Sequence, residues 1–214
     1  SQVALGANGY TLAVATGPGQ LGERAKAYVY QGGQFNWDLR QTIPMDDVVL
    51  SFAPRLALSG DGSRLAMGGG SVVRIYVSSG WEYTQVASAG GEYGSLYNGG
   101  PLAFSYDGLR LAIGLPLSKA SGAGIWPGPA DPTTSDGAGA VAIWGEGTLH
   151  IWGPLGMIKA PNPDAGDNFG TALGMSYDGK TILVGAPNEA STATGVGGGQ
   201  ASNGQSLAGA AYLY

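Results

Sequence analysis

The sequence predicts an all-β fold, a β-propeller of about four blades, and three observations support this. A turn-and-strand unit occurs four times, at residues 5–14, 58–67, 104–113 and 175–184. The 214 residues include 40 glycines and 12 prolines beside short apolar runs, which is typical of short strands joined by tight turns. No segment keeps a 3.6-residue apolar period over several turns, which excludes long helices. Units repeated every few tens of residues indicate a propeller or solenoid.

Each repeat is predicted to be a blade of antiparallel strands, within one domain. An Asn-Gly or Asp-Gly turn joins the first two strands, because its glycine supplies the left-handed backbone of a tight hairpin. The repeats span approximately 1–49, 50–96, 97–168 and 169–214. The predicted second strands are 11–15, 64–68, 110–114 and 181–185, the third strands 26–30, 73–77, 140–144 and 210–214, and the fourth strands 35–43, 81–86 and 149–158.

The last repeat has no fourth strand in this sequence, so its third strand is predicted to be an open edge. An open edge exposes a row of unpaired backbone N–H and C=O groups. Three interpretations stand. The chain continues and the four blades are a section of a larger propeller, the blade tolerates three strands, or a strand of a neighbouring molecule completes it.

The last repeat resembles the FG-GAP family, whose blades form integrin-like β-propellers. Phe169-Gly170 resembles the FG and 185–187 the GAP; the other repeats match less well, at 15–18, at 68–70, and at Tyr93-Gly94 with 114–116. The resemblance implies a propeller and an extracellular setting, or one on the surface of a cell or virion. It implies no single function, because the family includes adhesion receptors and lectins.

Calcium sites are not carried over from this family. The D-x-D-x-D-G loop of its calcium-binding members is absent, and no cofactor or metal is predicted. The aspartates of the Asp-Gly turns are expected to shape their own hairpins, because Asn8 does the same work in the first repeat. These aspartates are Asp61, Asp107 and Asp178.

The other polar candidates are weak. Asp164, Asp167 and Asn168 predict a polar turn, since a cation such as calcium needs six to eight oxygen ligands. His150, the only histidine, is expected on an exposed strand, and no G-x-S-x-G nucleophile motif accompanies it. The sequence therefore predicts that the protein is not an enzyme.

The composition of the chain limits the classes of partner that it is expected to bind. Charged residues make up 12% of the chain and the net charge is −5, which argues against binding to nucleic acid or anionic membranes. There is no cysteine, and no apolar run is long enough for membrane insertion. Low charge also gives little protection against self-association.

Two regions are predicted to contact a partner. Trp126 lies in the insertion 117–137 with no strand pattern around it, and the edge 210–214 places Ala210, Tyr212 and Tyr214 beside the long loop 188–207. A proline at Tyr212 is expected to remove a donor from that edge.

The predicted function is a surface-exposed structural or adhesion module that binds other proteins or copies of itself. The alternative is a carbohydrate-binding, lectin-like propeller, with an aromatic ring and a carboxylate in repeated pockets between blades.

Overall fold

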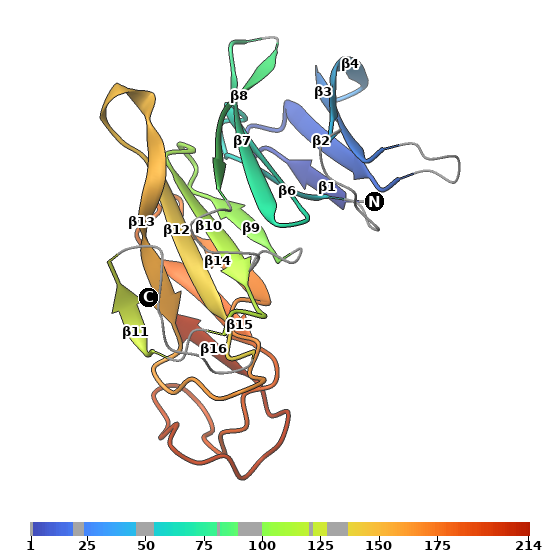
Figure 1. Ribbon diagram of the computed structural model, residues 1–214. Helices are drawn as coiled ribbons and strands as arrows, with labels where there is room; N and C mark the ends of the chain where they lie inside the picture. Colours follow the sequence, from blue (N-terminus) through green and yellow to red (C-terminus); the bar gives the residue numbers. More distant parts are fainter. Residues whose placement is uncertain are drawn as a thin grey trace.

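The computed structural model describes residues 2–18, 24–45, 54–80, 82–89, 100–119, 122–127 and 137–214. It confirms an all-β propeller with four small antiparallel sheets, which follow one another along the chain as blades (Figure 1). Tyr93 and Gly94, which resemble the FG pair in the third repeat, and residue 81, where a fourth strand was predicted to begin, lie outside the described residues. In the described part, no helix has the length and hydropathy needed to cross a membrane.

The first two blades each have four strands in chain order. Blade 1 contains β1 (Gln2–Leu5), β2 (Thr11–Thr16), β3 (Lys26–Gly33) and β4 (Asn36–Pro44). Blade 2 contains β5 (Arg55–Leu58), β6 (Arg64–Gly69), β7 (Val72–Ser78) and β8 (Tyr83–Ala89). The predicted strands are therefore found, with β8 a few residues later than the predicted 81–86.

The last two blades do not have four strands: blade 3 has one more and blade 4 has one fewer among the described residues. Blade 3 has five, β9 (Leu102–Phe104), β10 (Arg110–Leu115), β12 (Ala140–Glu146), β13 (Trp152–Lys159) and β11 (Gly124–Trp126), with β11 outermost beside β13. Blade 4 has three, β14 (Ala172–Met175), β15 (Ile182–Ala186) and β16 (Ala210–Leu213). The predicted three-stranded last blade is confirmed for the described residues, whereas β11 was not predicted.

The predicted strand 149–158 begins three residues too early. Thr148–His150 form a short 3-10 turn (η2), in which Leu149 has φ 63° and His150 has φ 58°. A left-handed backbone is incompatible with a strand, so β13 begins only at Trp152. His150 therefore lies on a turn and not on a strand, which corrects the prediction.

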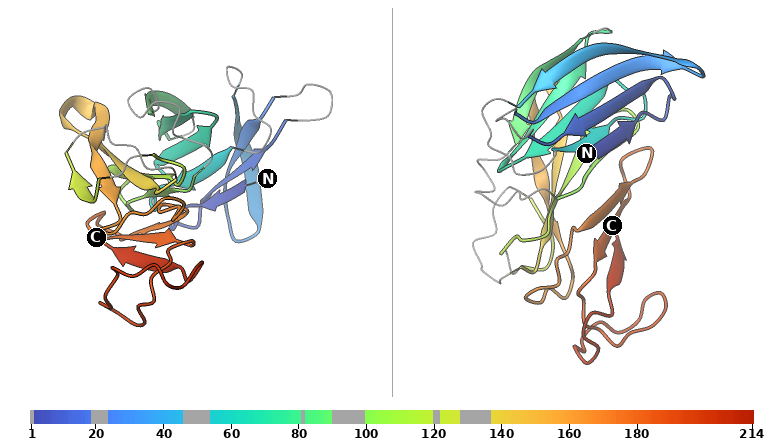
Figure 2. Two further views of the ribbon diagram at one scale, coloured as in Figure 1. Left: turned by 60° about the horizontal axis from the view of Figure 1, so that its bottom comes forward. Right: turned by 90° about the vertical axis from the view of Figure 1, so that its right-hand side faces the viewer.

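Three apolar clusters hold the blades together, one at each junction between successive blades. Blades 1 and 2 meet around Val29 and Met67, blades 2 and 3 around Ile75 and Leu111, and blades 3 and 4 around Phe169. Contacts between the first strands run in the same order, from β1 to β5, from β5 to β9 and from β9 to β14. The blades thus form an arc, with blades 1 and 4 at its two ends (Figure 2).

The repeated turns link each blade to the next. Asn8 N–H donates to Gly60 O at 2.8 Å, Asp61 N–H to Tyr106 O at 3.1 Å, and Tyr106 N–H to Tyr177 O at 3.0 Å. Within its own turn each Asx oxygen accepts the N–H two residues later, from Tyr10, Ser63, Leu109 and Lys180. The prediction that these aspartates shape their own hairpins is confirmed.

The residues that resemble the FG pair sit at a junction. Phe169 is fully buried between blades 3 and 4, where its N–H donates to Ala138 O at 3.1 Å and its ring meets Tyr212 edge to face. Gly170 has φ 92° and would place a Cβ 2.4 Å from Ala140 O. Only glycine fits this approach.

Candidate functional site

The outer edge of blade 4 is the clearest candidate site. β16 pairs with β15 on one side only and is the last strand of its sheet among the described residues. Tyr214 and Ile182 exchange two backbone hydrogen bonds, of 3.0 and 2.9 Å. Because such pairs alternate along an antiparallel ladder, Tyr212 also points its backbone groups toward β15. The backbone N–H and C=O of Ala211 and Leu213 therefore point away from the sheet.

This geometry corrects the expected effect of proline at Tyr212. The N–H that such a substitution removes belongs to the pairing with Val184, not to the open edge. The donors of the open edge are those of Ala211 and Leu213. Sequence alone does not fix the register, and hence it does not fix which N–H groups face outward.

A groove of about 650 Å³ runs beside this edge. One wall is the strand from Ala210 to Tyr214, and the other is the loop around Val196 and Gln200. Thr192 Oγ1 and Ser202 Oγ lie 2.5 Å apart, and Gln205 N–H donates to Ala190 O at 2.9 Å, so hydrogen bonds within the loop hold its shape. The side chain of Val196, which lines the groove, is fully exposed.

Blade 3 shows how an outer edge of this protein accepts one more strand. β11 pairs antiparallel with β13, with Gly124 opposite Lys159 and Trp126 opposite Met157. Trp126 thus lies on a short edge strand and not on an irregular loop; its side chain is partly exposed, and Nε1 donates to Ala123 O at 3.1 Å. The outer side of β16, the third strand of blade 4, carries no strand of the described chain.

The side chains predicted at the edge are largely engaged inside the blade. Ala210 is half-buried, and Tyr214 donates its hydroxyl to Lys159 O at 2.6 Å. Tyr212 is buried, and its hydroxyl lies 3.0 Å from Asn162 Oδ1 and 3.2 Å from Glu189 Oε2. Burial, together with the charge of Glu189, raises the pKa of Tyr212, and burial raises the pKa of Tyr214 to about 12. What this edge offers to a partner is therefore its outward backbone groups and the exposed side chains of Ala211 and Leu213.

Asp164 and Asp167 meet a third carboxylate that the sequence did not indicate. Glu189 is fully buried beside Asp167 and accepts Ser191 N–H at 3.0 Å, while Asp167 Oδ2 accepts Asp164 N–H at 2.8 Å. Burial and the charges of Glu189 and Asp164 raise the pKa of Asp167 to about 6. Within the described ranges, no group of three or more His, Cys, Asp or Glu residues has the geometry to hold a metal ion.

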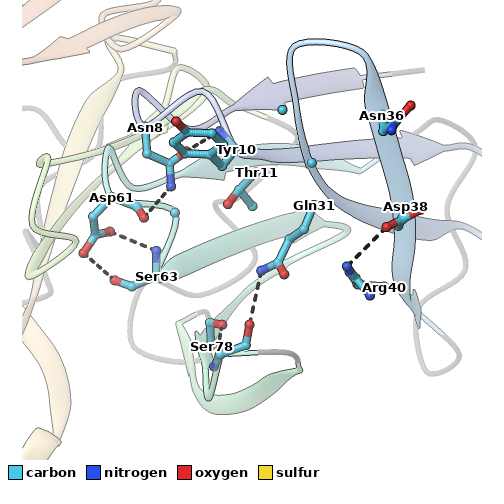
Figure 3. A pocket seen from close by; sticks show the side chains of 14 residues that line it. Asn8, Tyr10, Thr11, Gln31, Asn36, Asp38, Arg40, Asp61, Ser63 and Ser78 are labelled. Carbon is cyan, nitrogen blue, oxygen red and sulfur yellow. Dashed lines mark hydrogen bonds and ion pairs between the residues drawn. The ribbon is translucent and has the colours of Figure 1, made fainter.

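A second hollow, of about 710 Å³, lies between blades 1 and 2 (Figure 3). The exposed ring of Tyr10 borders it, and Asp38 and Arg40 form an ion pair of 3.3 Å across from that ring. Burial pushes the pKa of Asp61 up, but hydrogen bonds from Ser59 and Ser63 outweigh it, so the pKa is lowered. The Asp61 carboxylate is thus held by its own turn, whereas Asp38 is paired with Arg40.

The comparisons with known proteins identify a fold and no family. No family model and no curated protein matches the chain. A functionally unknown protein from Desulfotomaculum acetoxidans has a TM-score of 0.54 at 13% identity, over 86% of this chain and 48% of that one. A chain of a mitotic checkpoint complex gives 0.52 at 16%, over 88% and 45%. A proposed 6-phosphogluconolactonase from Bacteroides uniformis gives 0.51 at 11%, over 86% and 46%.

The low sequence identities and the partial coverage limit what this structural similarity shows. At such identities it shows the fold alone, and the chain spans about half the length of each solved structure. Because no family model matches, the resemblance to FG-GAP repeats stays a prediction.

The prediction that the protein is not an enzyme was wrong as an inference from the fold. A proposed lactonase shares this arrangement of blades, so the scaffold is also used for catalysis. The absence of a familiar nucleophile motif is therefore no ground for ruling out an enzyme.

Proposed function

We propose that this chain is a protein-binding module, whose fourth blade accepts an extended strand of a partner along β16. The observation that carries the proposal is the three-stranded blade with an open edge beside a groove. An open edge is a template for a further strand, and main-chain hydrogen bonds supply the affinity. The proposal includes the expected surface setting, outside a cell or on a cell or virion.

The chemistry of the edge defines the donor. The N–H and C=O of Ala211 and Leu213 offer two donors and two acceptors, spaced for a strand of either direction. Alternate side chains of the donor would enter the groove that Val196 helps to line. The lining includes small and apolar residues such as Ala193 and Val196 together with the polar Gln200, so the groove offers both apolar and hydrogen-bonding contacts to these side chains.

Precedent within the molecule supports this mode. β11 covers the outer edge of β13 with only three residues, so short strands dock on these blade edges. The shortness of β11 supports the docking of a short partner strand on blade 4.

A synthetic peptide provides the first test. The strand Tyr83–Ala89 completes blade 2 and serves as the probe, with a matched peptide carrying proline at its centre as control. We expect the probe, and not the control, to slow backbone amide exchange at Ala211 and Leu213. Ala211→Pro should abolish binding, because it removes an outward N–H, whereas Ala201→Pro in the exposed loop should not. Fast exchange at both amides with every strand peptide tried would contradict the proposal.

The hollow between blades 1 and 2 favours a second candidate function, binding of a carbohydrate. The Tyr10 ring gives a stacking surface, and Asp38 and Arg40 supply polar partners. The residues that replace Tyr10 in the other repeats are Ser63, Leu109 and Lys180, so this would be one site and not a repeated set. A glycan array on the wild type and Tyr10→Ala tests it, and a glycan bound equally by both would exclude this hollow.

A further inference from the structure

Asn203 and Gly204 form an asparagine–glycine pair in the long loop that follows Glu189. Both residues are exposed, and neither belongs to a helix or strand. Asn203 Nδ2 donates to Asp164 Oδ2 at 2.9 Å. Within the described residues, no other hydrogen bond is made by the Asn203 carboxamide or by the N–H of Gly204. A backbone nitrogen that nothing described engages thus follows directly after an exposed carboxamide.

We propose that Asn203 is a modification site, which the folded protein converts to aspartate or isoaspartate without an enzyme. The nitrogen of Gly204 attacks Cγ of Asn203 and the Cγ–Nδ2 bond breaks, so that ammonia leaves with the proton of the Gly204 N–H and a succinimide ring forms. Water then adds to one of the two ring carbonyls. Opening at Cγ gives aspartate, and opening at the main-chain carbonyl gives isoaspartate. Glycine permits the attack because it has no Cβ to obstruct a close approach of its backbone.

The first repeat holds the same pair of residues in an arrangement that opposes this reaction. Asn8 Oδ1 accepts the N–H of Tyr10 at 2.9 Å, and Asn8 Nδ2 donates to Asp61 O of blade 2 at 2.7 Å. The N–H of Gly9 donates to Gly6 O at 2.9 Å. The carboxamide oxygen, the leaving group and the nucleophile are therefore all engaged, and the attack requires the turn to open. The hydrogen bonds, and not the sequence, distinguish the two pairs.

The modification reverses the character of the contact that ties the loop to the turn between blades 3 and 4. The present contact is a hydrogen bond from a neutral amide to a carboxylate, which is stronger than one between neutral groups. A carboxylate at residue 203 cannot donate to Asp164, and the two negative charges repel each other. Asp167 accepts the N–H of Asp164, so the new charge also joins an existing acidic cluster. We expect the loop to open around residue 203 after conversion.

This inference goes beyond the proposed function and is independent of it. Asn203 does not line the groove beside β16, and the reaction needs only water. Peptide binding at Ala211 and loss of ammonia at Asn203 can therefore fail separately.

The test is peptide mapping by mass spectrometry of the native protein during incubation at mildly alkaline pH. We expect Asn203 to convert at least about tenfold faster than Asn8, because several hydrogen bonds must open first at Asn8. In protein unfolded by urea the two residues should convert at similar rates, since neither glycine is then held by a turn. A third pair, Asn98-Gly99, lies outside the described residues and is followed as a separate peptide.

Two variants test the chemistry and its consequence. Gly204→Ala would place a Cβ 3.0 Å from Thr192 Cγ2, the end of an exposed side chain, so the loop should keep its shape while Asn203 converts several-fold more slowly. Asn203→Asp reproduces one product. It should speed amide exchange at Gln205, whose N–H donates to Ala190 O at 2.9 Å. Near-UV circular dichroism shows whether each variant is folded.

Each other result overturns the inference or its consequence. If Asn203 stays intact in the native protein and converts in urea, the folded loop protects it. Equal native rates at Asn8 and Asn203 show that the hydrogen bonds of the turn do not control the reaction. An unchanged rate in Gly204→Ala excludes the succinimide route. Unchanged exchange at Gln205 in Asn203→Asp excludes the opening of the loop.

Discussion

Arg64 of blade 2 reaches across to Glu146 of blade 3, with 2.8 Å between Nη2 and Oε2. The carboxylate is almost fully buried, and its other oxygen lies 2.6 Å from Nδ1 of His150. Burial pushes the pKa of Glu146 up, but the hydrogen bonds and charges of Arg64 and His150 outweigh it, so the pKa is lowered. The lone histidine of the chain therefore contacts, within blade 3, the carboxylate that pairs with Arg64 of blade 2.

Glu146→Gln should lower the free energy of unfolding by roughly 2 kcal/mol at pH 7, since Arg64 loses its charged partner. A lowered pKa in the folded state means that the contribution of Glu146 is present above its usual value of 4.5 and disappears as the pH falls through the folded value. Urea unfolding at pH 7 and at pH 3 should thus show a smaller pH dependence in the variant. Asp38→Asn, in an exposed ion pair, is the control and should change little.

Asp167→Asn should stabilise the protein at pH 7 by up to about 3 kcal/mol, because it removes a charge that burial and neighbouring carboxylates disfavour. The folded pKa of about 6 lies above the unfolded value of 3.8, so wild-type stability should fall as the pH rises from 3.8 through 6. Thermal unfolding between pH 4 and pH 8 measures this, and the variant should lack that slope. A wild type equally stable at both ends would contradict the assignment.

Gly62→Ala should cost more than Gly9→Ala, although both glycines occupy the same turn position with φ 74° and 72°. Each alanine pays about 1 kcal/mol for the left-handed backbone. Of the two, only Gly62 would bring its new Cβ against the preceding blade, 2.5 Å from Thr11 Oγ1, while Gly9 has nothing within 4 Å. Overpacking adds roughly 1–3 kcal/mol. If urea unfolding gave equal losses of unfolding free energy for the two variants, the junction between blades 1 and 2 would have to accommodate the added methyl group without cost.

Gly156→Ala should detach β11 from blade 3. The new Cβ would lie 2.6 Å from the backbone oxygen of Trp126, whereas Gly153 on the same strand has nothing within 4 Å. We expect faster amide exchange at Ile125 in Gly156→Ala and no change in Gly153→Ala. If Ile125 exchanges as slowly in Gly156→Ala as in the wild type, β11 stays paired with β13 and the expectation is wrong.

The repeated turns could be predicted from sequence because their mechanism is local. Asp61, Asp107 and Asp178 each bond a backbone N–H two residues away, and a glycine follows at once. β11 was missed because Gly124–Trp126 is too short to show an alternating pattern and takes its order from β13. Glu189 was missed because it meets Asp167 only through tertiary folding.

The sequence located the candidate site at the segment 210–214, but the structure was needed to show which of its backbone groups face outward. The open third strand at 210–214 followed from counting strands. Which backbone groups face outward depends on the register between Val184 and Tyr212, and the groove depends on how the loop after Glu189 folds back. These relations join residues far apart in the sequence, so no local pattern reports them.

The contact between successive turns has a consequence for the curvature of the arc. The second residue after each turn glycine packs on the turn glycine of the next blade, Thr11 on Gly62, Arg64 on Gly108 and Arg110 on Gly179. The bulk placed there acts as a spacer that sets the rotation from one blade to the next. Exchanging these spacers in concert offers a way to redesign how many blades complete a turn.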